Sequence, residues 1–360
     1  MTAIHIKRPP ALVFRAGPDA LAHIRRQGFA PQDVRLIPGA AGGPKALGLH
    51  GLDCAIFGEW LPRAPRERWL AGASVGAWRF SALAQPDPIA ALKRFTELYV
   101  GQHYSLKPTL EEITAKCEAM VDAMLDGHAQ DIVDNPHWRL AIFAVRSKGW
   151  LADEGARLGS GLAAVATHNA LSRQSLGKYF DRVVLHSPGK TPPFLPLQDF
   201  PTEAVPLSGD NLRPALLASG AIPMVIRGVT VLPGAGPGVY RDGGLLDYHF
   251  DLPFSKHKGV VLYPHFVDRI VPGWFDKSLP WRKPDPAHVS NVLLIAPSRE
   301  YVASLPFGKI PDRNDFRQFA GRDDERMRYW HQAIGESERL GDEFLQLAES
   351  GELVARLQPL

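Results

Sequence analysis

The sequence predicts an α/β protein, a three-layer α/β/α fold in which helices cover both faces of a mainly parallel central sheet. Short apolar, β-branched runs alternate along the chain with segments whose apolar residues recur at helical spacing. Glycines mark two successive junctions between a predicted strand and a predicted helix, a pattern typical of parallel sheets. No internal repeat or long polar linker interrupts the alternation, so we expect a single domain over residues 1–360.

The first half of the chain supplies the glycine-marked junctions. Residues 1–31 are expected to form an irregular lead and then a short helix over 20–27. The run at 34–37 predicts a strand, and Pro44 suits the start of a helix over 45–57. Residues 69–71 predict a second strand before an apolar helix. Further helices are expected from about 86 to 99 and over 110–125, where Glu111 and Glu112 occupy the first turn.

The second half continues the alternation. Strands are predicted at 139–145 and 182–186, on either side of a small-residue helix over 155–171. Residues 187–206 read as a loop, and a helix over 211–219 stops before Pro223. Strands are expected at 239–241, 259–263 and 292–296. One long charged helix is predicted over 323–348, with its charges on a solvated face.

Composition excludes several classes of protein. The net charge of +3 is too small to indicate nucleic-acid binding. The two cysteines, Cys54 and Cys117, have neither metal-site nor disulfide spacing, which favours a reducing compartment. The polar start has no leader pattern, and no window reaches 18 uninterrupted apolar residues. We therefore expect a cytoplasmic protein, with peripheral membrane contact as an open alternative.

The candidate nucleophile is Ser74. It lies in Gly72-Ala73-Ser74-Val75-Gly76, a G-x-S-x-G pattern between a predicted strand and a predicted helix. Such an elbow holds the serine hydroxyl on a strained turn, clear of the backbone, and points the first amides of the helix at it. Val75 opens that helix and is a candidate for binding the substrate oxygen. The pattern is short, and an ordinary turn is the competing interpretation.

A second glycine-rich loop precedes the elbow by one strand. Gly42 and Gly43 lie in it, and Lys45 follows Pro44. A nucleotide-binding Walker loop is disfavoured, because Lys45 is followed by alanine and the hydroxyl that binds magnesium is missing; the dinucleotide pattern G-x-G-x-x-G is also absent. The remaining interpretation is an oxyanion hole made of the amides of Gly42 and Gly43. It requires the loop to lie beside Ser74, as two consecutive parallel strand–helix units would place it.

Ser74 needs a base, and two kinds are available. Asp242 follows a short predicted strand and precedes Gly243 and Gly244, which permit a sharp turn around the carboxylate. An Asp-Gly turn with no catalytic role is the competing interpretation of that segment. The histidines that could act instead, none in a distinctive setting, are His186, His249, His257, His265 and His331.

The ordered set of motifs resembles the patatin-like phospholipase family. The matching pieces are the loop Gly42-Gly43-Pro44-Lys45, the G-x-S-x-G elbow, Ala218-Ser219-Gly220-Ala221-Ile222-Pro223, and Asp242-Gly243-Gly244. They span about residues 34–253, which leaves 254–360 as a C-terminal sheet and helix extension. The resemblance implies a lipid acyl hydrolase with a Ser–Asp dyad and no histidine. Carried over, Ser74 is the nucleophile, Asp242 the base, and Gly42 and Gly43 the oxyanion donors.

The resemblance also implies a role for Lys45, which matches the basic position of the family's loop and would support the loop or an anionic headgroup. The sequence departs from the family twice. The loop is shorter than the usual run of three glycines, and Tyr248 lies where the family often has an asparagine near a proline. The first departure concerns the oxyanion donors, and the second concerns the choice of substrate.

The expected function is hydrolysis of a lipid or acyl ester through an acyl-enzyme, with no cofactor, no metal and no nucleic-acid partner. An aspartate with its ordinary pKa of ~3.9 is a weak base, so the dyad requires a desolvated Asp242 bonded directly to Ser74. The aromatic residues Phe57, Trp60 and Trp78 are expected either near the site or in the core.

Three alternatives stay open: an α/β-hydrolase-type esterase or thioesterase that uses histidine, a non-catalytic lipid- or acyl-binding module, and a metal site formed by Asp247, His249 and Asp251. Neither the lipid, the acyl position nor the oligomeric state follows from the sequence.

Overall fold

A single mixed sheet runs through the molecule. The computed structural model describes residues 9–256 and 258–360, and its strands follow the order β10-β1-β9-β8-β2-β3-β4-β5-β6, with β7 paired to β4. The strands are β1 Leu12–Ala16, β2 Val34–Gly39, β3 Arg68–Ala73, β4 Trp138–Ser147, β5 Phe180–His186, β6 Thr202–Pro206, β7 Val239–Asp242, β8 Val260–Pro264, β9 Val292–Pro297 and β10 Leu357–Pro359. Neighbours are parallel except β1 with β9, and β4 with both β5 and β7. The predicted mainly parallel sheet is confirmed.

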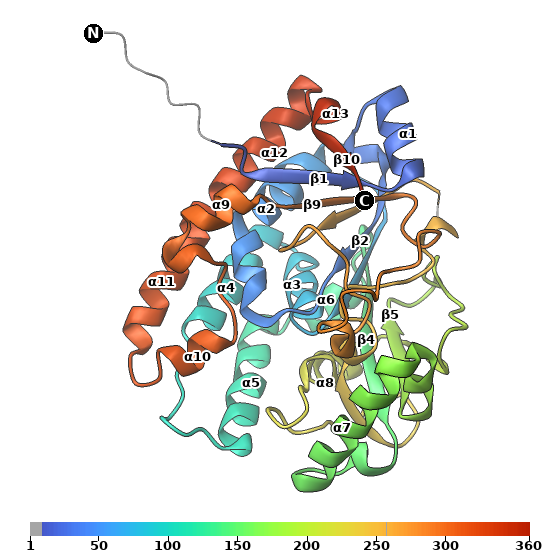
Figure 1. The fold of residues 1–360 in the computed structure, drawn as a ribbon, viewed down its shortest axis with the longest axis vertical. Coiled ribbons are helices and arrows are strands. Elements are labelled where there is room, and N and C mark those ends of the chain that lie inside the picture. The colour runs from blue at the N-terminus through green and yellow to red at the C-terminus, as the bar shows by residue number, and fades with distance from the viewer. Residues whose placement is uncertain (1–8, 257) are drawn as a thin grey trace.

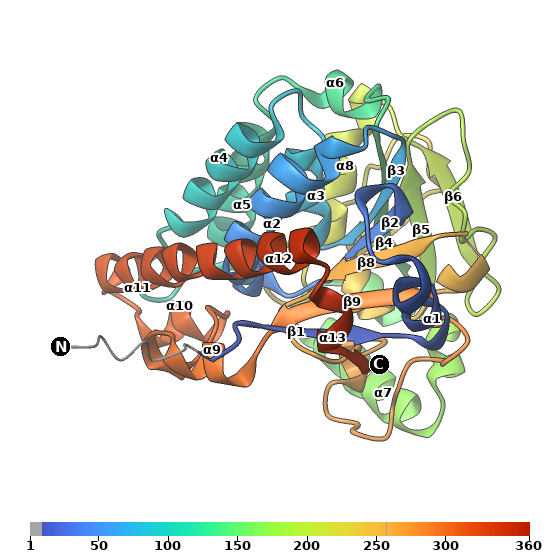
Figure 2. The same ribbon diagram turned by 90° about the horizontal axis from the view of Figure 1, so that it is seen from above.

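Helices flank the sheet on both faces, which makes the three layers that the sequence predicts. In Figure 2, α3, α4 and α5 lie on one side of the strands and α7 on the other. The helices are α1 Pro18–Gln27, α2 His50–Ala55, α3 Val75–Leu83, α4 Pro88–Val100, α5 Leu110–Leu125, α6 Ala129–Val133, α7 Ala156–Leu171, α8 Gly209–Gly220, α9 Arg299–Ser304, α10 Asn314–Gln318, α11 Asp323–Glu336, α12 Glu338–Ser350 and α13 Leu353–Arg356. Figure 1 shows their positions around the sheet.

The core lies against the central strands. Every residue of β3, β8 and β9 is buried, as expected for strands covered by helices on both faces. The C-terminal strands β8, β9 and β10 belong to the same sheet as the motif-bearing strands. Among the described residues, none of the helices combines the length and the apolar character needed to cross a membrane.

Three strands are not predicted from the sequence, and all three lie in the outer parts of the sheet. β1 falls inside the predicted irregular lead, β6 inside the predicted loop, and β10 in a segment for which no element is predicted. β6 and β10 each end in proline and are partly exposed, so they lack the buried apolar pattern that marks a central strand.

Two helices that the sequence predicts as continuous are divided into shorter elements in the structure. Residues 45–57 form a 3-10 helix, Gly43–Leu49, then α2, then a π-helical turn, Ile56–Trp60. Residues 323–348 form two helices, α11 and α12, that meet at Ser337. Gly51 in α2 explains the second break: its amide donates to Ser337 Oγ at 2.8 Å, and a Cβ on Gly51 would lie 2.3 Å from the Ser337 carbonyl oxygen. A contact between distant segments therefore overrides the local helical pattern.

The topology brings the two glycine-marked junctions together. β2 and β3 are adjacent and parallel, with Gly39 opposite Gly72. The loop after β2 and the elbow after β3 consequently emerge at the same edge of the sheet, as predicted.

Candidate active site

Ser74 occupies a strained elbow between β3 and α3. Its φ of 55° and ψ of −129° lie in a region that side-chain-bearing residues rarely adopt, a strain typical of functional turns. The flanking glycines permit it. A Cβ on Gly72 would lie 2.6 Å from the backbone of Ala77, and one on Gly76 would lie 1.9 Å from the Gly39 carbonyl oxygen. The elbow predicted from the G-x-S-x-G pattern is present.

Asp242 reaches Ser74 because two strands meet along one side of β4. The end of β3 pairs Ala73 with Phe143, and the end of the antiparallel β7 pairs Asp242 with Ala144. The residue after β3 and the last residue of β7 are therefore neighbours. Ser74 Oγ donates to Asp242 Oδ2 at 2.7 Å, although the two residues are 168 positions apart.

Both carboxylate oxygens of Asp242 accept a hydrogen bond. Oδ1 accepts from the Gly244 amide at 2.7 Å, while Oδ2 accepts from Ser74. A Cβ on Gly243 would lie 2.1 Å from the Phe143 carbonyl oxygen, so glycine is required where the chain turns away from β4. The Asp-Gly-Gly segment thus turns the chain and also orients a carboxylate toward Ser74.

Ser219, at the end of α8, fixes the backbone of the elbow. Its Oγ accepts from the Ser74 amide at 2.8 Å and donates to the Phe143 carbonyl oxygen at 2.7 Å. The Phe143 carbonyl lies on β4 between the end of β3 and the end of β7. The Ser219 hydroxyl donates to it there, in place of a backbone amide from a neighbouring strand. In the sequence, only the family resemblance points to this segment, and it assigns no role to Ser219.

Burial makes the Asp242 carboxylate a stronger base. Desolvation raises the pKa of the carboxyl above its ordinary value. The charge of Arg313, the bonds from Ser74 and Gly244, and the charge of Lys277 oppose that rise. The result is a buried carboxylate with a raised pKa in direct contact with a hydroxyl, as general-base catalysis by aspartate requires.

The glycine loop after β2 lies at the same site. Gly42 has an extended φ of 179°, and Gly43, with a φ of +59°, begins the short 3-10 helix. Within the described part of the chain, their amides donate to no backbone or side-chain acceptor. The amide of Val75 opens α3, where a helix leaves its first amides unpaired. Gly43, Ser74 and Val75 line one cavity, whereas Gly42 lines a second cavity beside it.

The candidate histidines lie elsewhere. No described histidine is bonded to Ser74 or Asp242. Burial lowers the pKa of His265 to about 3 and that of His249 well below its ordinary value, and both rings pack among aromatic side chains. His186 contacts the Ser187 carbonyl, and His331 lies 3.7 Å from a Glu97 carboxylate oxygen. His257 lies outside the described residues.

The three residues of the alternative metal site have other partners. Asp247 receives two bonds from Arg182, at 2.7 and 2.9 Å, and Asp251 accepts from His288 at 2.9 Å. His249 accepts from the Val271 amide at 3.1 Å. Within the residues that the structure describes, no group of three or more metal-ligating side chains converges.

An apolar cavity of about 600 Å³ opens at Ser74. Apolar residues of its lining include Trp78, Tyr99, Ile113, Cys117 and Ile226. All three aromatic residues expected near the site or in the core, Phe57, Trp60 and Trp78, are buried in the core, and Trp78 also lines this cavity. The cavity has the size and lining of a site for an apolar chain.

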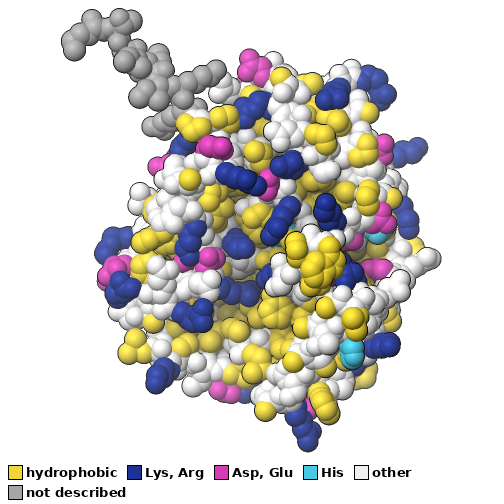
Figure 3. Space-filling view, in the orientation of Figure 1, with side chains coloured by type: hydrophobic (Ala, Val, Ile, Leu, Met, Phe, Trp, Pro, Cys, Tyr) yellow, Lys and Arg dark blue, Asp and Glu magenta, His cyan; other side chains and the backbone are white. Residues whose placement is uncertain are grey.

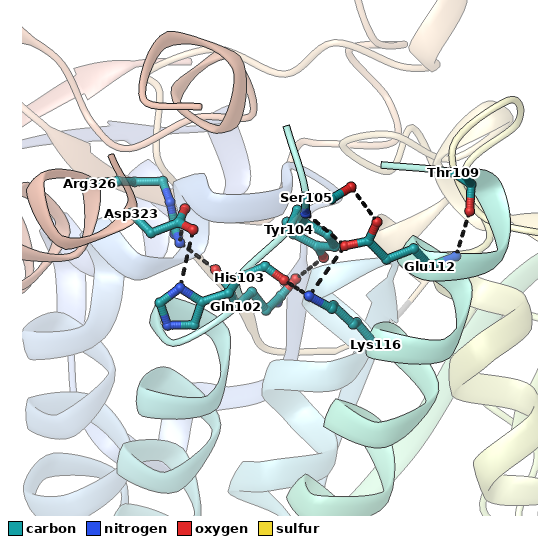
Figure 4. Close-up of polar contacts among 9 residues, drawn as sticks. All are labelled: Gln102, His103, Tyr104, Ser105, Thr109, Glu112, Lys116, Asp323 and Arg326. Carbon is teal, nitrogen blue, oxygen red and sulfur yellow. Dashed lines mark hydrogen bonds and ion pairs between the residues drawn. The ribbon is translucent and has the colours of Figure 1, made fainter. Parts of the chain in front are cut away.

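The loop between α4 and α5 forms one wall of this cavity and is tied at both ends (Figure 4). On the α11 side, His103 contacts Asp323 at 3.1 Å, and Arg326 donates to the Gln102 carbonyl. On the α5 side, Glu112 accepts from the amide and the hydroxyl of Ser105, at 2.8 and 2.6 Å. Leu106 follows Ser105 in the loop, lines the cavity, and is 71% exposed.

A second, polar cavity of about 220 Å³ adjoins the first on the Asp242 side. Gly42 and Lys45 line it, together with two cations that the sequence does not single out, Lys277 and Arg313. Neither belongs to a motif, and both come from segments distant in sequence. Lys and Arg side chains gather around a hollow with an apolar floor on the face shown in Figure 3.

Comparison with known proteins adds no assignment: no family model, no curated protein and no solved structure matches this chain.

Proposed function

We propose that this protein is a serine acyl hydrolase that cleaves carboxylic esters through a Ser74–Asp242 dyad and an acyl-enzyme, as the resemblance to patatin-like phospholipases implies. The observation that carries the proposal is the 2.7 Å bond from a strained-elbow serine to a buried aspartate. The apolar cavity at Ser74 favours a lipid or another long acyl ester as the substrate.

In the proposed reaction, Ser74 Oγ attacks the acyl carbonyl carbon and its proton passes to Asp242 Oδ2. The carbonyl oxygen becomes an oxyanion that the amides of Gly42, Gly43 and Val75 stabilise, at ~3 kcal/mol of barrier for each well-placed donor. When the tetrahedral intermediate collapses, the bond to the leaving alcohol breaks, and Asp242 returns the proton to the alcohol oxygen.

Hydrolysis of the acyl-enzyme repeats the sequence with water. Asp242 takes a proton from the attacking water, the oxyanion forms again against the same amides, and the proton returns to Ser74 as the acid leaves. The bond from Gly244 keeps the carboxylate in one orientation through both halves, so that Oδ2 faces the reacting oxygen.

The test is fluorophosphonate labelling of the wild type, Ser74→Ala and Asp242→Asn, together with turnover of a short acyl ester and a phospholipid. We expect labelling and turnover in the wild type and the loss of both in each variant. Undiminished labelling in Asp242→Asn would remove aspartate as the base and favour the histidine-using esterase. A wild type that is folded but neither labels nor turns over ester would favour the non-catalytic binding module.

A further inference from the structure

The two cavities at the dyad differ in chemistry and share a wall. Ser74 lines the apolar cavity and Asp242 lines the polar one, so the hydrogen bond between them crosses the boundary. Ile222 and Arg313 line both cavities. If an acyl chain fills the apolar cavity with its carbonyl at Ser74, the polar cavity receives the other side of the ester, which is the leaving group.

Three cations line the polar cavity, each from a different segment. Lys45 follows the glycine loop, and its Nζ lies 5.1 Å from the centre of the Phe266 ring. Lys277 Nζ lies 4.1 Å from the centre of the Tyr248 ring. Arg313 precedes α10, with its Nε 3.0 Å from the position that a Cβ on Gly43 would take.

The three cationic side chains are not paired directly with the carboxylates near them. Across residues 9–256 and 258–360, none of the three makes a side-chain hydrogen bond or an ion pair. Two acidic residues also line the cavity. Asp312 forms an ion pair with Lys309 at 3.1 Å, and both oxygens of Asp242 are held within the dyad. With three cationic and two acidic side chains in its lining, the polar cavity has a net positive charge while Lys277 is protonated.

The proximity of these charges is unfavourable while no anion is bound. Desolvation, followed by the charges of Arg313 and Lys45, lowers the pKa of Lys277 to about 7 against the opposing charge of Asp242. Desolvation also lowers the pKa of Lys45, against the opposing charge of Asp312. An anion in the cavity would offset the repulsion and stabilise the charged form of Lys277. Phosphate fits this set best, because it is doubly charged near neutral pH and arginine binds it in a bidentate manner.

The aromatic residues of the cavity do not favour a choline group. Tyr248 and Trp274 are of the type that binds quaternary ammonium ions through their faces. Here the Lys277 ammonium already lies over one face of each ring, 4.1 Å from the centre of the Tyr248 ring and 5.4 Å from the centre of the Trp274 ring. A second cation in that place would meet like charge.

We propose that Lys277, Arg313 and Lys45 form a selectivity site for a net-anionic leaving group, a phosphate monoester, and exclude a choline-bearing one. This inference rests on the proposed function, since it takes the occupant of the apolar cavity to be the acyl chain of the substrate. Within it, Arg313 and Lys277 are the residues that determine specificity.

The experiment measures binding alone, with ligands that cannot be hydrolysed. The wild-type protein is titrated with 1-O-alkyl-glycerol 3-phosphate and with 1-O-alkyl-glycerophosphocholine of the same chain length, both below their micellar concentrations. Because the alkyl chain is held by an ether bond, the readout is independent of ester hydrolysis. We expect the phosphate monoester to bind at least about tenfold more tightly, the lower bound for one hydrogen bond to a charged group.

Two variants and two matched controls locate the effect. Arg313→Gln and Lys277→Gln should each weaken binding of the phosphate monoester by about 10- to 100-fold and leave binding of the choline lipid unchanged. Arg328→Gln and Lys283→Gln remove the same charges from exposed positions away from the polar cavity and should change neither affinity.

The outcomes separate this inference from the proposed function. Equal affinity of the wild type for the two ether lipids, or equal losses for both lipids in the variants, would overturn the selectivity site even if Ser74 is labelled and hydrolyses ester. A preference that depends on Arg313 and Lys277 would support it even if no ester is hydrolysed. Competition by inorganic phosphate for the monoester, but not for the choline lipid, would show that the phosphate itself is bound; a failure to compete would count against the site.

Discussion

Replacing Asp242 with asparagine should remove activity and stabilise the protein. The carboxylate accepts from Ser74 Oγ on Oδ2 and from the Gly244 amide on Oδ1, both at 2.7 Å. Asparagine has one acceptor oxygen and one NH₂ donor. Its oxygen must face the Gly244 amide, which only donates, so its NH₂ faces the serine hydroxyl and cannot take a proton from it.

The magnitude follows from the loss of the general base. A general base typically accelerates a reaction 10²–10⁴-fold. We therefore expect kcat for a short ester to fall by about 10³-fold, equivalent to ~4 kcal/mol of activation barrier. In the proposed function the substrate is bound by the two cavities, so KM should change little. Turnover of a chromogenic butyrate ester measures both constants. Asp251→Asn, which alters a carboxylate bonded to His288 away from the dyad, is the matched control.

The stability change has a definite sign. Because burial raises the pKa of Asp242 in the folded state, ionisation costs folding free energy, and stability falls as pH rises through the folded pKa. Asparagine carries no such charge. Asp242→Asn should therefore melt at a higher temperature than the wild type at pH 8, and the difference should shrink as the pH falls and the wild-type carboxyl becomes protonated. Activity within tenfold of the wild type, or a lower melting temperature at pH 8, would refute the account of Asp242 as a desolvated base.

Four other perturbations test different parts of the site. Ser219→Ala leaves a buried amide and a buried carbonyl unpaired, so the free energy of unfolding should fall by about 1–3 kcal/mol in denaturant titrations, with a loss of kcat. Gly76→Ala places a Cβ 1.9 Å from a β2 carbonyl oxygen, and it should destabilise the protein by about 3 kcal/mol and abolish fluorophosphonate labelling. Arg313→Gln removes a charge that lowers the pKa of Asp242, so the acid limb of kcat/KM should move to higher pH. Ile113→Trp narrows the apolar cavity and should shift the chain-length optimum to shorter esters, with each excluded methylene costing about 0.8 kcal/mol in kcat/KM.

The contact between Ser74 and Asp242 could be predicted because both residues lie in short patterns with a local cause. Gly72 and Gly76 are required by the elbow, and Gly243 by the turn after β7, so the sequence around Ser74 and Asp242 carries the constraint. The central strands could be predicted for a similar reason. Burial on both faces demands continuous apolar runs, which the sequence displays directly.

The remaining features depend on contacts between distant segments. The break between α11 and α12 is explained by the fit of Gly51 against Ser337, which no local pattern reveals. Arg313 and Lys277 resemble ordinary exposed cations in the sequence, and only the fold brings them to one cavity. The outer strand β6 is short and half exposed, and its pairing with β5 decides its conformation.

The end-to-end meeting of β3 and β7 has a consequence for the folding of the chain. In the proposed mechanism, Ser74 becomes reactive only when Asp242, 168 positions later in the chain, has paired along the far part of β4. Contacts of such long sequence separation form late, because closing the intervening loop is entropically costly. A nascent or partly unfolded chain would then carry an inert serine. Reactivity toward a fluorophosphonate would accordingly report completed folding, and its recovery during refolding should lag behind the return of helical signal.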